Sequence, residues 1–177
     1  PLLGLVRVRA PHKEGNQVSR KEVILTPEGL KQLQDEITHL STVKRDEVAE
    51  RIRQAREFGD ISENSEYDDA KNEQAMIEHR ISLLQEKLRR ARVIKESDID
   101  TDRVSVGSTV TLRDVEGGEI RIYTLVGSAE ADPTKAKLSN ESPVGQAILG
   151  KRAGEVVTVP VPVGSLQYEI LSIGKMS

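Results

Sequence analysis

The sequence predicts an α+β protein in which a long antiparallel two-helix coiled-coil hairpin precedes a small sheet domain with one short helix. Three observations support this fold class. Apolar residues recur every three or four positions over two stretches that a short turn separates, as in coiled coils. Neither Pro nor Gly occurs between Ile61 and Val106. From about residue 100 onward, apolar and polar residues alternate as they do in strands.

Composition limits the possible functions. Charged residues make up 31% of the 177 positions and aromatic residues only 2%, which indicates much exposed helix and a small compact core. A formal net charge of -3 gives no general basic footprint for nucleic acid, and the absence of Cys excludes disulfides and thiolate metal sites. No apolar run approaches the roughly 18 residues of a membrane span. We therefore expect a cytoplasmic protein with no membrane partner.

Residues 1–22 show neither helical nor strand periodicity and include no initiator Met. We interpret them as a disordered extension, or as upstream or cloning-derived sequence, and assign them no function. The predicted organisation is then a hairpin over residues 23–99, with its acidic tip at 58–63, and a sheet domain over residues 100–177.

The first helix of the hairpin begins with a strong start signal. Thr26 can cap free backbone amides, Pro27 fits the first helical position, and Glu28 complements the helix dipole. The helix should run to about Glu57, although its apolar pattern loosens after Leu40. Its apolar positions are Leu30, Leu33, Ile37, Leu40, Val43, Val48, Ile52 and Ala55.

A short turn separates this helix from the second one. Gly59 can take the left-handed conformation that ends a helix, Asp60 or Ser62 can cap the next helix, and Glu63 is expected in its first turn. A short turn forces the helices to lie antiparallel, and about 30 residues give an arm roughly 45 Å long. The second helix has an uninterrupted seam of Tyr67, Ala70, Gln74, Ile77, Ile81, Leu84, Leu88 and Ala91.

The C-terminal region reads as a small antiparallel sheet. Turn signals occur at residues 116–118 and 162–164, and Ser142 and Pro143 open a short helix over 144–149. A body of this size has little room for a deep pocket. The predicted strands are residues 104–106, 109–112, 120–126, 156–160 and 167–173.

Acidic residues gather around the tip, and an acidic turn is most often only a solubilising loop. Here, however, Asp60 and Glu63 flank a tight turn at the end of a rigid arm. Mg²⁺ prefers carboxylate oxygens, but two carboxylates are an incomplete site, so the pair could complete a two-metal phosphoryl-transfer centre in a partner. The acids between residues 57 and 73 are Glu57, Asp60, Glu63, Glu66, Asp68, Asp69 and Glu73.

Two basic residues lie behind these acids. Antiparallel packing could bring Arg56 and Lys71 to the same level of the arm, where they would form a small patch for an RNA backbone or 3′ end. The alternative is ordinary intrahelical pairing, of Arg56 with Asp60 and of Lys71 with Asp68. The residues alone leave this choice open.

Several segments, in order, resemble bacterial Gre transcript cleavage factors, which are transcription elongation factors. Residues 55–67, AREFGDISENSEY, match a tip motif of the general form AR-x-x-GD-x-x-EN-x-EY. The resemblance extends from about Val23 to the C-terminus. Further matches are residues 25–29 (LTPEG), 70–74 (AKNEQ), 126–132 (VGSAEAD) and 140–151 (NESPVGQAILGK).

The resemblance implies a coiled coil followed by an FKBP-like domain, and a mechanism. The coiled coil enters the secondary channel of backtracked RNA polymerase, where Asp60 and Glu63 act in trans, helping to hold the second Mg²⁺ and to orient the attacking water. The polymerase then cuts its own transcript. Arg56 and Lys71 correspond to the patch that contacts the extruded 3′ end of the RNA. The chain would thus be an accessory factor and not an enzyme, with no cofactor of its own beyond the shared Mg²⁺.

The same resemblance implies roles for other residues. Gly59, Asn64 and Tyr67 would shape the tip, and Asn64 and Tyr67 could instead contact the catalytic loop of the polymerase. For Tyr67, core packing is at least as good an interpretation, because it begins the seam. The loop at Ser142 and Pro143 would dock on the channel rim, although it also caps a helix. We expect the chain to be a monomer.

Three other functions compete with this one. A Gre-like inhibitor that occupies the channel would have an altered tip, whereas the spacing of Asp60 and Glu63 is retained here. A prolyl isomerase needs an aromatic-lined pocket, but the predicted body has only Tyr123 and Tyr168 and no Trp or Phe. A coiled-coil adaptor or chaperone would need no particular residues at the tip.

Overall fold

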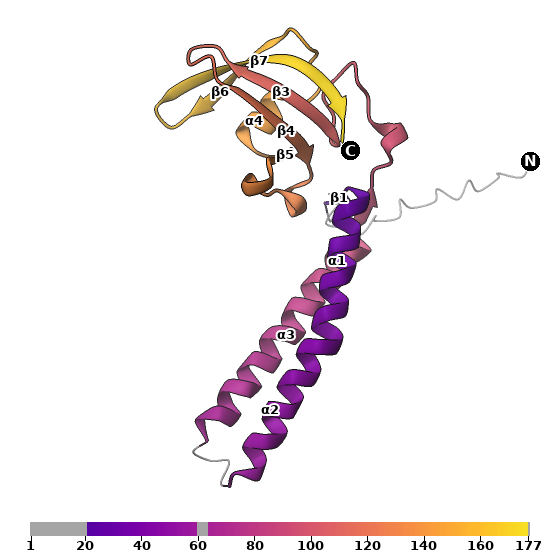
Figure 1. Cartoon of the computed structure of the whole chain (residues 1–177), viewed down its shortest axis with the longest axis vertical. Helices are drawn as coiled ribbons and strands as arrows, with labels where there is room; N and C mark the ends of the chain where they lie inside the picture. The colour runs from indigo at the N-terminus through magenta and orange to yellow at the C-terminus, as the bar shows by residue number, and fades with distance from the viewer. Residues whose placement is uncertain (1–20, 60–63, 177) are drawn as a thin grey trace, which may run out of the picture.

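The computed structural model describes residues 21–59 and 64–176, and shows a long helical hairpin that projects from a curled sheet (Figure 1). The prediction for residues 1–22 falls outside this range over residues 1–20, and so do the predictions for the segment from Asp60 to Glu63. No helix in the described part of the chain is long and apolar enough to cross a membrane.

The first arm of the hairpin is one continuous helix with a π-helical turn in its middle. It consists of α1 (Pro27–His39), the π turn Leu40–Lys44 and α2 (Arg45–Glu57). Thr26 caps it as predicted, because its hydroxyl accepts a 3.0 Å hydrogen bond from the amide of Gly29. Beyond its end, Gly59 has φ +125°, a backbone conformation that favours glycine.

The π turn explains why the apolar pattern loosens after Leu40. Val48 follows Leu40 by eight positions, one more than a heptad requires. A π turn takes one extra residue into the helix. The residues beyond it therefore stay on the buried face: Val48 is 1% exposed and Ile52 is 8% exposed.

The second arm is α3 (Ser65–Arg89), which lies antiparallel to α2 (Figure 1). Its seam is buried against the first arm as predicted, with Ala70 and Ile81 in one cluster with Val48 and Ile52. Two predicted boundaries were wrong. The N-cap is Asn64 and not Ser62 or Asp60, and α3 ends at Arg89, so that Ala91 lies in a strand.

A two-stranded parallel sheet closes the base of the hairpin. β1 (Val23–Leu25) pairs with β2 (Ala91–Val93), with Ile24 opposite Arg92. Neither strand was predicted, because three residues are too few to show a periodicity. The pairing joins the chain before α1 to the chain after α3, so the two ends of the hairpin form one unit.

The body is a five-stranded sheet in the order β5-β4-β3-β7-β6. Four strands pair antiparallel as predicted, and β5, which was not predicted, adds to β4 in parallel. The predicted strand at 104–106 is not one, because Val104 pairs by hydrogen bonds with Gly150 and Lys151 outside the sheet. The strands are β3 (Ser108–Asp114), β4 (Ile120–Val126), β5 (Lys137–Ser139), β6 (Val156–Val161) and β7 (Gly164–Lys175).

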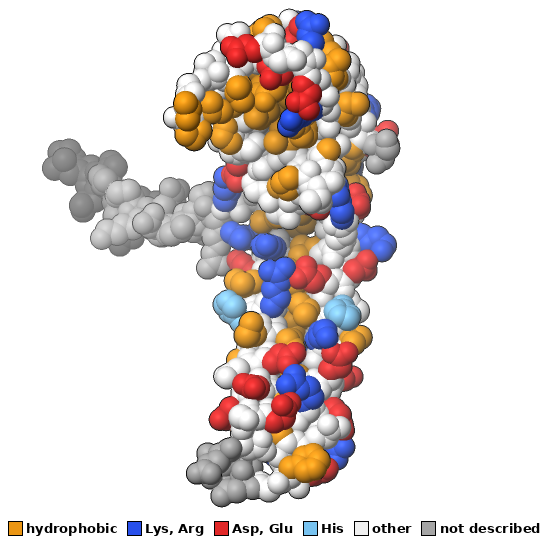
Figure 2. All heavy atoms as spheres, turned by 60° about the vertical axis from the view of Figure 1, so that its left-hand side comes forward, with side chains coloured by type: hydrophobic (Ala, Val, Ile, Leu, Met, Phe, Trp, Pro, Cys, Tyr) orange, Lys and Arg blue, Asp and Glu red, His pale blue; other side chains and the backbone are white. Residues whose placement is uncertain are grey.

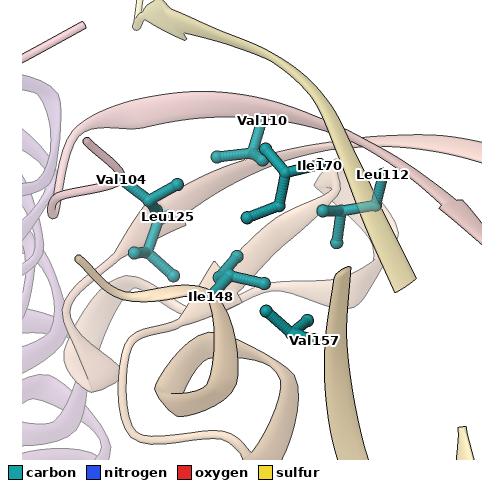
Figure 3. Packing of buried hydrophobic residues seen from close by; sticks show 7 residues of the cluster. All are labelled: Val104, Val110, Leu112, Leu125, Ile148, Val157 and Ile170. Carbon is teal, nitrogen blue, oxygen red and sulfur yellow. The ribbon is translucent and has the colours of Figure 1, made fainter. Parts of the chain in front are cut away.

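One apolar cluster holds the body together. The helix α4 (Pro143–Ile148) covers one face of the sheet and inserts Ile148, which is fully buried, among side chains of the strands (Figure 3). Tyr123 and Tyr168 pack against the edge of this cluster. Its members are Val104, Val110, Leu112, Leu125, Ile148, Val157 and Ile170.

Candidate functional site

The tip of the hairpin is held by the side chain of Asn64. Its Nδ2 donates a 2.8 Å hydrogen bond to the carbonyl oxygen of Ala55 in α2, and its Oδ1 accepts one of 3.3 Å from the amide of Tyr67. The first contact crosses between the helices and the second caps α3. Asn64 therefore ties together the two helix ends at the tip.

The two acids expected to assist a metal, Asp60 and Glu63, lie outside the described residues. They belong to the four residues that connect Gly59 to Asn64, between helix ends that the Asn64 side chain holds together. Within residues 21–59 and 64–176, no group of three or more His, Asp or Glu side chains could hold a metal ion. Carboxylate oxygens suit Mg²⁺, and two of them leave most of its coordination sphere to other ligands.

Acids that flank the tip are already paired with arginines. Arg51 of α2 reaches across to α3, where it binds Glu66 at 2.9 Å and also binds Glu73. Figure 2 shows acidic and basic side chains interleaved along this part of the arm. Sequence reasoning missed Arg51, because its partners are 15 and 22 residues away and only the register of the two helices brings them together.

A second arginine pairs along its own helix. Arg53 binds Glu50 at 2.6 Å and also binds Glu57. Hydrogen bonds from Arg53, and then from Gln54, lower the pKa of Glu50 from 4.5 to about 2. Glu57, like Glu66 and Glu73, thus has an arginine partner and does not add an uncompensated charge to the tip.

The two residues of the expected basic patch, Arg56 and Lys71, lie near Tyr67. The guanidinium carbon of Arg56 lies 5.7 Å from the centroid of the Tyr67 ring, a cation–π contact that joins α2 to α3. Lys71 lies one turn further along α3 on the same side as Tyr67, and its Nζ donates a 2.8 Å hydrogen bond to Gln74. Tyr67 itself is half-buried against the arm core, so it serves packing and holds Arg56.

Both basic side chains are exposed, and neither forms an ion pair with any of the described residues. The alternative pairing of Lys71 with Asp68 is not formed, because Lys71 contacts Gln74 instead. The alternative pairing of Arg56 with Asp60 concerns a residue outside the described range. Among the described residues, no acidic side chain therefore neutralises either of these two positive charges.

The loop at Ser142 and Pro143 caps α4 in the body. The hydroxyl of Ser142 accepts a 3.0 Å hydrogen bond from the amide of Gly145 and donates one of 2.7 Å to the carbonyl of Ser139. Pro143 is exposed at the first helical position. This geometry accounts for the structural role of the loop as the cap of α4.

Comparisons with known proteins cover both parts of the chain. A sequence profile described as "Transcription elongation factor, N-terminal" matches residues 23–93, and one described as "Transcription elongation factor, GreA/GreB, C-term" matches residues 99–175. The transcription elongation factor GreA of Alkaliphilus oremlandii is 60% identical over 153 residues, which cover 86% of this chain and 96% of that protein. GreA of Thermoanaerobacter pseudethanolicus is 59% identical over 155 residues, covering 88% and 99%.

Among solved structures, GreA factor homolog 1 of Thermus thermophilus is similar at 31% identity, with 87% of this chain and 99% of that chain covered and a TM-score of 0.40. The family profiles account for both the hairpin and the body, and the relatives match over nearly their whole length. The chain belongs to the GreA/GreB family of transcription elongation factors.

Proposed function

We propose that this elongation factor stimulates the cleavage of backtracked nascent RNA by bacterial RNA polymerase, and so rescues arrested complexes. The observation that carries the proposal is the braced end of the hairpin. The first arm spans residues 27–57, about 45 Å of helix, and Asn64 fixes the two helix ends between which Asp60 and Glu63 are carried. Such an arm can deliver carboxylates into a recessed site through the secondary channel of the enzyme.

The chemistry at that site is a phosphoryl transfer. Mg²⁺ bound there would polarise the phosphate and favour ionisation of the attacking water. This chain would contribute the carboxylates of Asp60 and Glu63, which complete the ligand set and orient the water. Because two carboxylates do not form a metal site alone, we propose an accessory factor that activates the polymerase and is not an enzyme itself.

The basic residues near the tip would act together with the acids. Arg56, held over Tyr67, and Lys71 would bind phosphates of the extruded RNA 3′ end and keep the scissile bond near the acids. The body would dock on the channel rim through the loop at Ser142 and Pro143, whose outer side is exposed. We propose that a single copy acts in this way in the cytoplasm.

The competing functions have less support. Tyr123 and Tyr168 pack against the core of the body, so they are committed to packing and not to an isomerase pocket. An adaptor would not require the cation–π contact and the Asn64 bridge at the tip. A channel-blocking inhibitor remains the alternative within the family, and a single assay separates it from a cleavage factor.

The assay uses bacterial RNA polymerase stalled in a backtracked complex with end-labelled RNA and Mg²⁺. Adding the full chain should shorten the transcript and leave a 3′ end that the polymerase extends when nucleotides are supplied. The matched controls are the complex without the chain and the complete mixture without Mg²⁺. Slower RNA extension without any shortening would show an inhibitor and contradict the proposal.

A further inference from the structure

The half-buried carboxylate of Glu130 joins the body to the first turn of the hairpin. Its two oxygens accept hydrogen bonds from the backbone amide of Thr26, at 2.6 Å, and from the Thr26 hydroxyl, at 2.5 Å. We call these two bonds the Glu130 clasp. Thr26 is only 4% exposed and is also the N-cap of α1, so the clasp holds the arm at the residue where its first helix begins.

The backbone on both sides is shaped for this close approach. A Cβ built on Gly29 would fall well under 3.0 Å from the end of the Glu130 side chain. A Cβ on Gly127, just before the turn that carries Glu130, would fall equally close to the carbonyl oxygen of Ile24. Glycine on each face lets the body and the base of the hairpin meet without intervening side chains.

Two ion pairs join the base of the hairpin to the body beside the clasp, one of them between Lys21 and Glu141. In the other, Lys137 of β5 binds Glu28, in the first turn of α1, at 3.0 Å. The hydrogen bond from Lys137 lowers the pKa of Glu28. The Glu28 side chain is 64% exposed, so this pair is screened by solvent and contributes less than the clasp.

Among the described residues, the clasp is one of a few contacts that fix the direction of the arm, beside the ion pairs of Lys137 with Glu28 and of Lys21 with Glu141. In the described part of the chain, one covalent segment, residues 94–107, connects the hairpin to the body, since β1 and β2 close the hairpin on itself. With an arm of about 45 Å, a rotation of about 10° at the base displaces the tip by roughly 8 Å. Misplacement by about 1 Å is enough to lower the rate of a positioned reaction.

We propose that Glu130 is a positioning residue, whose clasp on Thr26 sets the direction of the arm and thereby the point that the tip reaches when the body is docked. The effect on cleavage rests on the function proposed above, whereas the effect on arm direction does not. The two are therefore measured separately.

Two variants open the clasp in different ways. Glu130→Ala removes the acceptor. Gly29→Ala removes none of the hydrogen-bonding groups of the clasp, and it favours the helix because alanine has the higher helix propensity. Its added methyl group, however, displaces the Glu130 side chain. Because the helix propensity of alanine offsets part of any lost stabilisation of α1, Gly29→Ala should open the clasp with a smaller loss of helix stability than Glu130→Ala. Glu116→Ala, which removes an exposed carboxylate in the turn after β3, is the matched control.

Arm direction is read by single-molecule energy transfer between dyes on two introduced cysteines, because the chain has no cysteine of its own. Met76→Cys places one on α3, and Val163→Cys places the other in the turn between β6 and β7, where the native side chains are 72% and 95% exposed. We expect one narrow distribution of energy-transfer efficiency for the parent and for Glu116→Ala. Both clasp variants should give a broadened or shifted distribution while their circular dichroism remains that of a folded protein. Unchanged distributions in both would overturn the proposal.

The same variants are then tested in the cleavage assay. Both clasp variants should lower the cleavage rate about tenfold or more. If the clasp variants show altered energy-transfer distributions but cleave at the parental rate, Glu130 does not position the tip for cleavage. If the parent itself does not stimulate cleavage, the function proposed above fails, and the dye distributions still decide whether Glu130 sets the arm.

Discussion

The side-chain amide of Asn64 donates a 2.8 Å hydrogen bond to the backbone carbonyl of Ala55, and so ties the start of α3 to the last turn of α2. The same side chain caps α3 through its oxygen. One residue thus closes both helices at the tip.

Substitution of Asn64 should separate these two contacts. Asn64→Ala loses both the cap and the cross-helix bond, and should lower the free energy of unfolding by about 2 kcal/mol. Asn64→Asp keeps an oxygen that caps α3 but cannot donate to Ala55, so about half of that loss is expected. Urea unfolding followed by circular dichroism measures both. Equal losses for the two variants would mean that the cross-helix bond contributes nothing.

Arg51 should matter more to the tip than Arg53. Arg51→Gln removes the bridge from α2 to Glu66 and Glu73, whereas Arg53→Gln removes pairs within α2 only. The Arg51 side chain is 40% exposed and that of Arg53 59%, so solvent screens both and each change should cost less than about 1 kcal/mol. Amide hydrogen exchange in the first turns of α3 should accelerate in Arg51→Gln alone. The same acceleration in both variants would refute the bridging role.

The basic patch predicts a salt-dependent loss. Arg56→Ala and Lys71→Ala should each weaken engagement of backtracked RNA, because each removes one exposed positive charge that has no ion pair with the described residues. The concentration of factor needed for half-maximal cleavage should rise, and should depend less steeply on salt. Lys151→Ala, which removes an exposed lysine of the body, serves as the control. Normal cleavage by both patch variants would show that Arg56 and Lys71 do not bind the RNA and have only a structural role.

The π turn predicts an unusual tolerance to deletion. Removing Val43, which is 45% exposed within the π turn, would restore heptad spacing between Leu40 and Val48. We expect the deleted protein to keep its thermal stability and its cleavage activity. Removing Ala49 of α2 instead would rotate Ile52 and Ala55 by about 100° away from the core, and should destabilise the hairpin by several kcal/mol. Similar melting temperatures for the two deletions would contradict this account.

Long periodic segments could be predicted from the sequence, and short ones could not. The hairpin follows from its repeated apolar spacing, and β3, β4, β6 and β7 follow from their alternation. β1, β2 and β5 are three residues each and form only because another strand is placed beside them. The π turn appeared in the sequence only as an interruption of the seam.

The site shows the same division. Thr26 and the positive φ of Gly59 could be predicted from local rules for helix ends. Arg51 and Glu130 could not, because their partners come from other elements and are chosen by the tertiary register. Glu130 lies 104 residues from Thr26 in the chain, a separation at which no local pattern indicates a contact.

The most direct test of the account removes only the charge of the two tip acids. Asp60→Asn together with Glu63→Gln keeps the size of both side chains, and Asp69→Asn is the matched control on α3, where the native acid is exposed. The double variant should lower the rate of transcript cleavage about 100-fold or more, because we propose that these acids act on the transition state. It should still compete with the parent for polymerase. Asp69→Asn should cleave normally. A double variant that binds and cleaves at the parental rate would contradict the central claim that Asp60 and Glu63 act in the active centre of the polymerase.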